Sequence, residues 1–232
     1  MNHLHAPRAL SAVPRLSRSR TSTARSRSPS GTHPAARAST LQEARNDARG
    51  CHACPLWRDA TQTVFGEGEA RAAVMLVGEQ PGDREDRAGR PFVGPAGQLL
   101  DRALAQAGID RENTYVTNAV KHFKFEPRGK RRMHKKPADA EIDACHQWLE
   151  RELEFVAPRL VVALGATAAR ALLGRATPIA SNRGRVVPLS RDTALLITVH
   201  PSALLRIPDS SKAQAYRRFL ADLEVARRFL AS

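Results

Sequence analysis

Cysteine is scarce in this chain, with three among 232 residues. A small, odd number argues against a disulfide framework and indicates a reducing compartment. Long apolar runs are also missing: no stretch approaches the roughly 20 residues that cross a bilayer, and the N-terminus lacks the apolar region of a secretory signal. We therefore expect a cytoplasmic protein with no membrane association.

Acidic residues are absent from residues 1–40, which contain seven arginines. This segment, rich in Ser, Arg, Pro and Ala, cannot bury enough surface to offset its ordering entropy, so we predict a disordered basic tail before a folded domain at 41–232. A transit-like segment, a flexible basic arm and a start codon assigned too far upstream all fit the tail. The net charge of +14 and the pI of about 11.0 indicate a polyanionic partner such as nucleic acid.

From about Leu41 onward, short apolar runs alternate with amphipathic stretches. Runs of this kind are typical of buried parallel strands, and we predict strands at 72–78, 115–120, 160–164 and 194–199. Helices are expected between and after them, at 95–107, 138–155, 166–173 and 211–230. The pattern predicts an α/β fold, a three-layer α/β/α sandwich with a central parallel sheet of about four strands.

A glycine-rich stretch follows the first predicted strand. It reads Gly-Glu-Gln-Pro-Gly-Asp at 78–83, then Glu-Asp at 85–86 and Gly-Arg-Pro-Phe-Val-Gly at 89–94. Ligands of open α/β sheets bind at the carboxyl ends of the strands, and glycines let the backbone approach a ligand closely. We therefore place the functional site at this turn.

The spacing of Cys51 and Cys54 lets two thiolates hold one metal ion or cluster. The third cysteine, Cys145, lies in a predicted helix far along the chain. Two free thiols at a helix end are the simpler interpretation of this pair.

These motifs in this order, with Asn118 ending a strand and His-Pro-Ser at 200–202 after the last strand, resemble the family 4 uracil-DNA glycosylases over roughly residues 48–230. The resemblance implies a 4Fe-4S cluster and excision of uracil from DNA, in DNA base excision repair. It also implies one pocket per molecule, so we expect a monomer acting on single-stranded and double-stranded uracil-containing DNA.

Three departures from that family resemble the UdgX class, which stays covalently attached to DNA after removing uracil. Gln80 stands where family 4 usually has a small residue, His122 where it usually has cysteine, and a basic Gly-Lys-Arg-Arg-Met-His-Lys-Lys insertion occupies 129–136. The implied cluster ligands are then Cys51, Cys54, His122 and Cys145. Three cysteines and a histidine suit zinc equally well chemically, and a surface position is the simpler interpretation of His122.

The resemblance also assigns the uracil pocket. Asn118 is expected to accept from uracil N3–H and donate to O4, which cytosine cannot satisfy. Phe92 is the expected stacking platform, although a core aromatic is the alternative. Glu85 is expected to crowd C5 and exclude thymine, with Gly82 and Asp83 completing the turn. His200 is expected to stabilise the departing base at O2, although histidine before Pro-Ser is often only a turn residue.

The covalent step is expected at His134. An amide at Gln80 cannot act as the general base that activates water, so hydrolysis should be slow. In UdgX-type proteins the histidine equivalent to His134 attacks the sugar C1' and the equivalent of Glu79 orients it. A solvated loop histidine is the alternative for His134.

Contacts to DNA are expected from the insertion, which should bind phosphates, and from the segment after the last strand, where Ala203, Leu204 or Leu205 can wedge into the duplex. The predicted DNA-contacting residues are Lys130, Arg131, Arg132, Lys135, Lys136, Ser202, Leu204 and Arg206. We predict a uracil-DNA glycosylase, a single-turnover hydrolase of the N-glycosidic bond that ends as an adduct through His134. A turning-over glycosylase and a non-catalytic, metal-containing DNA-binding protein are the alternatives.

Overall fold

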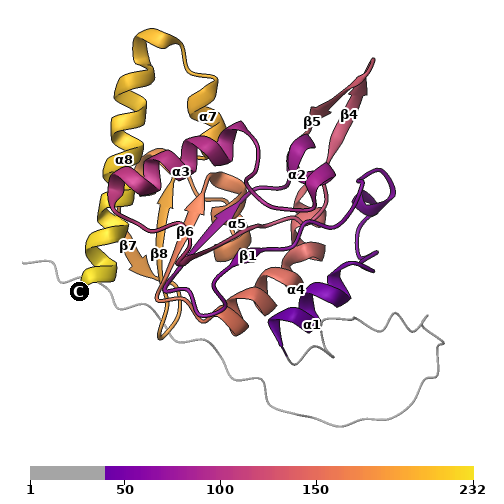
Figure 1. Ribbon diagram of the computed structural model, residues 1–232, viewed down its shortest axis with the longest axis horizontal. Coiled ribbons are helices and arrows are strands. Elements are labelled where there is room, and N and C mark those ends of the chain that lie inside the picture. The colour runs from indigo at the N-terminus through magenta and orange to yellow at the C-terminus, as the bar shows by residue number, and fades with distance from the viewer. Residues whose placement is uncertain (1–39) are drawn as a thin grey trace, which may run out of the picture. The chain divides into compact units, whose positions relative to one another are not determined.

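Residues 40–232 are described by the computed structural model shown in Figure 1. The predicted tail lies outside the described residues, apart from Thr40. Thr40 caps the first helix: its hydroxyl accepts the N–H of Glu43 at 3.1 Å, and the Glu43 carboxylate accepts the N–H of Thr40 at 3.1 Å. The folded part therefore begins with a capped helix.

The centre of the fold is a six-stranded sheet with the order β1-β3-β2-β6-β8-β7. The four inner strands, β3, β2, β6 and β8, run parallel, and the two short edge strands run antiparallel to them. The strands are β1 (Glu67–Gly68), β2 (Val74–Gly78), β3 (Thr114–Asn118), β6 (Leu160–Leu164), β7 (Val186–Pro188) and β8 (Ala194–Thr198). The predicted parallel sheet of about four strands is confirmed, and the sequence analysis missed only the edges.

Helices cover both faces of this sheet (Figure 1). On one face the core contains side chains of α3 (Pro95–Ala107), α7 (Pro201–Leu205) and α8 (Asp209–Ala231). On the other it contains side chains of α1 (Leu41–Ala48), α4 (Asp139–Val156) and α5 (Ala166–Leu173). The shorter helices are η2 (Pro55–Arg58), α2 (Asp83–Ala88) and α6 (Ile179–Asn182). The predicted three-layer sandwich is therefore confirmed.

The predicted helix boundaries follow from local signals. Helix α3 has Pro95 at its first position, where a missing N–H costs nothing, and ends at Gly108 in the left-handed region with φ of 73°. Helix α4 begins where the Glu141 carboxylate accepts the Ala138 N–H at 2.6 Å.

No helix among the described residues is long and apolar enough to cross a membrane.

The basic insertion, expected as a loop, forms a hairpin. Strands β4 (Phe125–Arg128) and β5 (Arg131–His134) pair antiparallel as a separate two-stranded sheet. Gly129 turns the chain with φ of 58°, which is why the hairpin closes there. Its last residue, His134, pairs with Phe125 at the base of the hairpin. The hairpin is the feature that brings His134 to the edge of the main sheet.

Candidate active site

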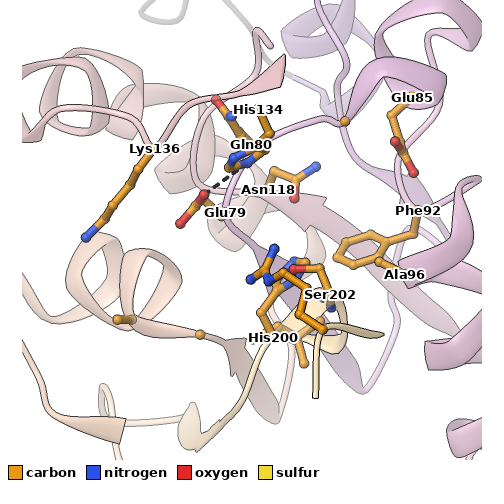
Figure 2. Close-up of a pocket in the computed structure, with 15 residues that line it drawn as sticks. Glu79, Gln80, Glu85, Phe92, Ala96, Asn118, His134, Lys136, His200 and Ser202 are labelled. Atoms are coloured by element: carbon orange, nitrogen blue, oxygen red, sulfur yellow. Dashed lines mark hydrogen bonds and ion pairs between the residues drawn. The ribbon is translucent and has the colours of Figure 1, made fainter. Parts of the chain in front are cut away.

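A cavity of about 500 Å³ lies at the carboxyl ends of β2, β3, β6 and β8 (Figure 2). The turn after β2, the hairpin and the segment after β8 all contribute to its wall. The lining residues that the sequence analysis singled out are Glu79, Gln80, Gly82, Glu85, Phe92, Asn118, His134, Lys136, His200, Ser202 and Arg206. Side chains far apart in the sequence therefore meet in one pocket, where the strand pattern predicted a site.

Asn118 and Phe92 lie together over Gly78. Gly78 pairs with Asn118 in the β2–β3 register, and a Cβ at Gly78 would lie 2.4 Å from Asn118 Oδ1 and 2.7 Å from Phe92 Cζ. Only glycine leaves room for both. Phe92 itself adopts φ of 57°, an uncommon conformation for a large side chain, and its backbone packs where any Cβ on Gly97 would clash. The rigid turn holds an aromatic ring beside a carboxamide, as recognition of a planar base requires.

The Glu85 carboxylate packs against the backbone of the same turn. Its Oε1 accepts the Gly94 N–H at 2.7 Å, and a Cβ on Gly82 or Gly94 would lie within 3 Å of its carboxylate. The carboxylate is therefore fixed in the wall near Phe92 (Figure 2). Asp83, predicted to belong to the uracil pocket, is not among the lining residues.

Glu79 and His134 form a pair in the pocket. His134 Nε2 lies 3.2 Å from Glu79 Oε1, and the Thr167 hydroxyl donates to Glu79 Oε2 at 2.5 Å. Burial alone would raise the pKa of Glu79, but the contacts with His134 and Thr167 outweigh it and hold that pKa below its usual value. An ionised Glu79 keeps the proton of a neutral imidazole on Nε2, which leaves the Nδ1 lone pair for another partner.

Thr167 is a site residue that the sequence analysis missed. It lies in the first turn of α5, directly after β6, and it is 3% exposed. Its position after the carboxyl end of a parallel strand was the available indication. By anchoring one oxygen of Glu79, it directs the other oxygen toward His134.

The Gln80 side chain fastens both ends of the hairpin. Its Nε2 donates to the carbonyl of Lys124 at 3.1 Å and to that of Lys135 at 3.0 Å, while its Oε1 accepts the Lys124 N–H at 3.0 Å. A carboxylate has no hydrogen to donate to two carbonyls. Gln80 therefore does more than replace a general base: its amide places the hairpin that carries His134.

Arg132 fastens the middle of the hairpin to α2. Its guanidinium binds Asp83 at 2.5 Å and the fully buried Asp86 at 2.6 Å, and lies 5.4 Å and 5.0 Å from the ring centroids of Phe123 and Phe125. The prediction that Arg132 contacts a DNA phosphate does not fit this geometry. Its charge and its planar face are already used inside the protein.

His200 closes the pocket opposite Asn118 (Figure 2). Its Nδ1 accepts the Ser202 N–H at 3.1 Å, so the neutral ring carries its proton on Nε2. Burial lowers the pKa of His200 to about 4; the nearby Glu79 opposes this shift, and His134 and Arg206 add to it. A neutral N–H donor thus persists well below neutral pH.

The predicted DNA contacts divide into two groups. Leu204 is buried among α3 and α8 side chains, so the prediction that it wedges into DNA is corrected; Leu205, 40% exposed, is available instead. Lys135 pairs with Glu126 near the hairpin base. Of the other predicted contacts, Lys136, Ser202 and Arg206 line the pocket, and Lys130, Arg131 and Lys135 are exposed on the hairpin or directly after it.

The three cysteines gather beside α4. Trp148 Nε1 donates to Cys51 Sγ at 3.1 Å, and the Lys121 N–H donates to Cys145 Sγ at 3.2 Å. Burial, with smaller contributions from the other two cysteines, raises the pKa of Cys145 to about 12, although Lys121 opposes the shift. At neutral pH the Cys145 thiol loses its proton only when a cation replaces it. Hydrogen bonds from N–H groups to sulfur are typical of metal-bound and cluster-bound thiolates.

The fourth predicted ligand, His122, is buried against Thr63. The Thr63 hydroxyl has one hydrogen, which it donates to the Ala48 carbonyl at 2.9 Å, so it accepts from His122 Nε2 at 2.9 Å. Burial lowers the pKa of His122, and the ring is neutral with Nδ1 unprotonated, the state that a ligand needs. No group of three or more His, Cys, Asp or Glu side chains in residues 40–232 is arranged to hold a single metal ion. The ligands of an iron-sulfur cluster stand further apart than those of a single ion. The three thiols and the imidazole fit such a cluster by their chemistry, and their geometry does not test it.

Phe92, Asn118, His134 and His200 thus line one pocket at the carboxyl ends of the parallel strands, where α/β folds bind their ligands. A family model described as "Uracil DNA glycosylase superfamily" matches residues 65–224, and the chain belongs to this superfamily.

Relatives of the chain include two type-4 uracil-DNA glycosylases that are each 38% identical to it. The protein from Thermotoga maritima aligns over 78% of this chain and 89% of its own length, and that from Pyrobaculum aerophilum over 72% and 86%. A type-5 uracil-DNA glycosylase from Pyrobaculum aerophilum is 34% identical over 67% of this chain and 74% of its own length. The predicted relation to family 4 is therefore confirmed.

Proposed function

We propose that this protein excises uracil from single-stranded and double-stranded DNA and then remains covalently bound to the abasic sugar through His134. The observation that carries the second half of the proposal is the Glu79–His134 pair inside the base pocket, 3.2 Å apart. A solvated loop histidine would not have an ionised, anchored carboxylate on one ring nitrogen. This arrangement supports His134 as a nucleophile: Glu79 orients the ring by binding Nε2, and Nδ1 is left to attack.

Recognition of uracil rests on Asn118 and Phe92. A flipped uracil stacks on the Phe92 ring, and the Asn118 carboxamide accepts from N3–H and donates to O4. Cytosine presents the opposite polarity and leaves two polar groups unpaired in a buried site, which costs a few kcal/mol. The fixed Glu85 carboxylate in the pocket wall is suited to exclude a methyl group at C5.

The chemical step begins when the C1'–N1 bond breaks and its electron pair leaves with the base. His200 Nε2–H donates to uracil O2, where the negative charge develops. The cationic C1' then accepts the lone pair of His134 Nδ1, which forms the new C1'–N bond. The ring becomes an imidazolium that keeps its proton on Nε2 and donates it in a hydrogen bond to the Glu79 carboxylate, and the uracil anion takes its proton from water.

Water competes poorly for the sugar cation. The Gln80 amide has no basic group, and its two N–H donors are already bound to the hairpin. A positioned imidazole meanwhile has a very high effective concentration at C1'.

The same chain is proposed to hold a 4Fe-4S cluster through Cys51, Cys54, Cys145 and His122. Bound there, the cluster would join Cys145 of α4 to the segments that contain Cys51, Cys54 and His122. The hydrogen bonds from Trp148 and Lys121 to two of the sulfur atoms support this assignment.

The test is incubation with a labelled single-stranded oligonucleotide that contains one uracil, followed by a denaturing gel. A slower band that survives denaturation supports covalent trapping. An alkali-labile product without that band indicates an ordinary turning-over glycosylase, and an unchanged oligonucleotide indicates a DNA-binding protein without this activity. Iron and labile sulfide in the purified protein test the cluster, and zinc alone would contradict it.

A further inference from the structure

An ion pair between Lys121 and Glu152 lies completely inside the protein, with both side chains 0% exposed. The Lys121 ammonium donates to Glu152 Oε2 at 2.5 Å, to the Thr117 hydroxyl at 2.7 Å and to the Asn118 carbonyl at 2.7 Å. Its three hydrogens are therefore all used. One of the three acceptors is the backbone of the residue assigned to uracil recognition.

The Glu152 carboxylate is equally well bonded. It accepts the Gly66 N–H at 2.8 Å, the Tyr115 hydroxyl at 3.1 Å and the Thr117 hydroxyl at 2.9 Å. A buried ion pair is weak evidence for stability, because apolar side chains of similar volume often stabilise a core as well or better. What the pair does provide is direction, because hydrogen bonds fix the positions of the groups that they join.

The group whose position matters most is the Asn118 side chain, which is assigned to uracil recognition. Within residues 40–232 its carboxamide makes no hydrogen bond to another protein group, so both of its polar ends are free for a base. The carboxamide lies over Gly78 beside Phe92, and its position depends on the backbone from which it extends. The hydrogen bond from the Lys121 ammonium to the Asn118 carbonyl is therefore a direct polar restraint on the residue that carries the recognition group.

Lys121 is also fixed at its own backbone. Its N–H donates to Cys145 Sγ at 3.2 Å, and its carbonyl accepts the Val64 N–H at 2.8 Å. The pair therefore fastens the short segment 118–122 to α4 through both side chain and main chain. This segment carries the recognition residue at one end and a candidate metal ligand at the other.

We propose that Lys121 and Glu152 are positioning residues that hold Asn118 against the uracil edge. The inference rests on the proposed uracil excision and deepens it. Neither side chain reaches the cavity, so both act through the Asn118 backbone. A shift of about 1 Å in a reacting geometry can lower a rate about 100-fold.

The test compares the wild-type protein with the double variant Lys121→Met, Glu152→Gln, which removes both buried charges together and leaves an amide oxygen for Gly66. We expect a melting temperature close to wild type, a single-turnover excision rate 10 to 100-fold lower, and a similar loss of affinity for an oligonucleotide with non-cleavable 2'-fluorodeoxyuridine. Affinity for the same oligonucleotide without uracil should not change. Iron content, measured in parallel, separates this effect from loss of the cluster.

Tyr115→Phe is the matched control, since it removes one hydrogen bond from Glu152 Oε1, whereas Lys121 binds Oε2, and it should leave the rate within about twofold. If the double variant does not fold, Lys121→Gln with Glu152→Gln, which also removes both buried charges but keeps polar groups at both positions, decides the question by the same two measurements. A folded variant with wild-type excision and wild-type binding of the fluorinated oligonucleotide would overturn the inference. A wild-type protein that releases no uracil would instead contradict the proposed function.

Discussion

Replacement of Arg132 with methionine should separate uracil excision from covalent trapping. Arg132 is the main charged contact between the hairpin and α2, and its side chain is only 16% exposed. Methionine keeps the apolar packing on Phe123 and Phe125 but leaves the Asp86 carboxylate, 0% exposed, without its cation. His134 lies two residues further along the same strand.

The magnitude follows from the two ion pairs. Removing one partner of a buried pair costs about 3 to 5 kcal/mol, but the Asp83 carboxylate is 41% exposed and contributes little. Asp86 also keeps the N–H of Thr61 at 3.0 Å, which reduces the loss further. We therefore expect hairpin docking to weaken by about 2 to 3 kcal/mol, or about 30 to 150-fold in its equilibrium.

The assay measures free uracil and the denaturation-resistant band in the same reaction. Arg132→Met should lower the rate of adduct formation by at least tenfold while uracil release changes much less, because Asn118, Phe92 and His200 lie outside the hairpin. Arg128→Met, the same substitution at an exposed position of the same hairpin, is the control and should trap normally. Trapping by Arg132→Met at the wild-type rate would refute the positioning role.

Three further outcomes are expected. Asn118→Asp replaces the donor to uracil O4 with a second acceptor and should lower single-turnover uracil excision about 100-fold, measured by release of labelled uracil; an unchanged rate would mean that another group reads the base. Thr63→Val removes the acceptor that fixes the His122 tautomer and should speed iron loss to a chelator about tenfold or more, followed by visible absorbance, while Thr63→Ser should not; equal loss from both would count against His122 as a ligand. Uracil release should persist as pH falls from 7 to about 5 and decline near pH 4, where His200 takes up a proton on Nδ1 and loses the hydrogen bond from Ser202 that orients its ring; a decline centred near pH 6.5 would contradict the lowered pKa.

The lowered pKa of His200 also affects the free energy of unfolding. Because the pKa of His200 is lower in the folded protein than in the unfolded chain, the unfolded chain binds the proton first as pH falls. This residue therefore reduces the free energy of unfolding progressively between about pH 6.5 and pH 4, and it has no such effect above that range.

The parallel strands and the helices α3 and α5 were predictable from the sequence alone. Buried parallel strands are continuous apolar runs, and the two helices are bounded by a proline or glycine at each end. The place of the pocket followed too, because Glu79 directly follows β2 and Asn118 ends the adjacent strand β3, so that the carboxyl ends of both strands meet at one edge.

The structural use of Gln80 and Arg132 was not predictable. The contacts of these residues join positions 44 to 55 apart in the sequence, and they exist only once the hairpin has folded back onto α2. An arginine in a run of basic residues suits a phosphate as well as a buried carboxylate. The difference is set by the aspartates at 83 and 86, whose proximity comes from tertiary packing.

Covalent trapping through His134 is tested most directly by tandem mass spectrometry of the wild-type protein after reaction with a uracil-containing oligonucleotide and digestion of protein and DNA. We expect a deoxyribose adduct on the peptide that contains His134, with fragmentation placing the added mass on that imidazole, and no such adduct in His134→Ser. An adduct on another residue, or complete uracil release with no modified peptide, would contradict it.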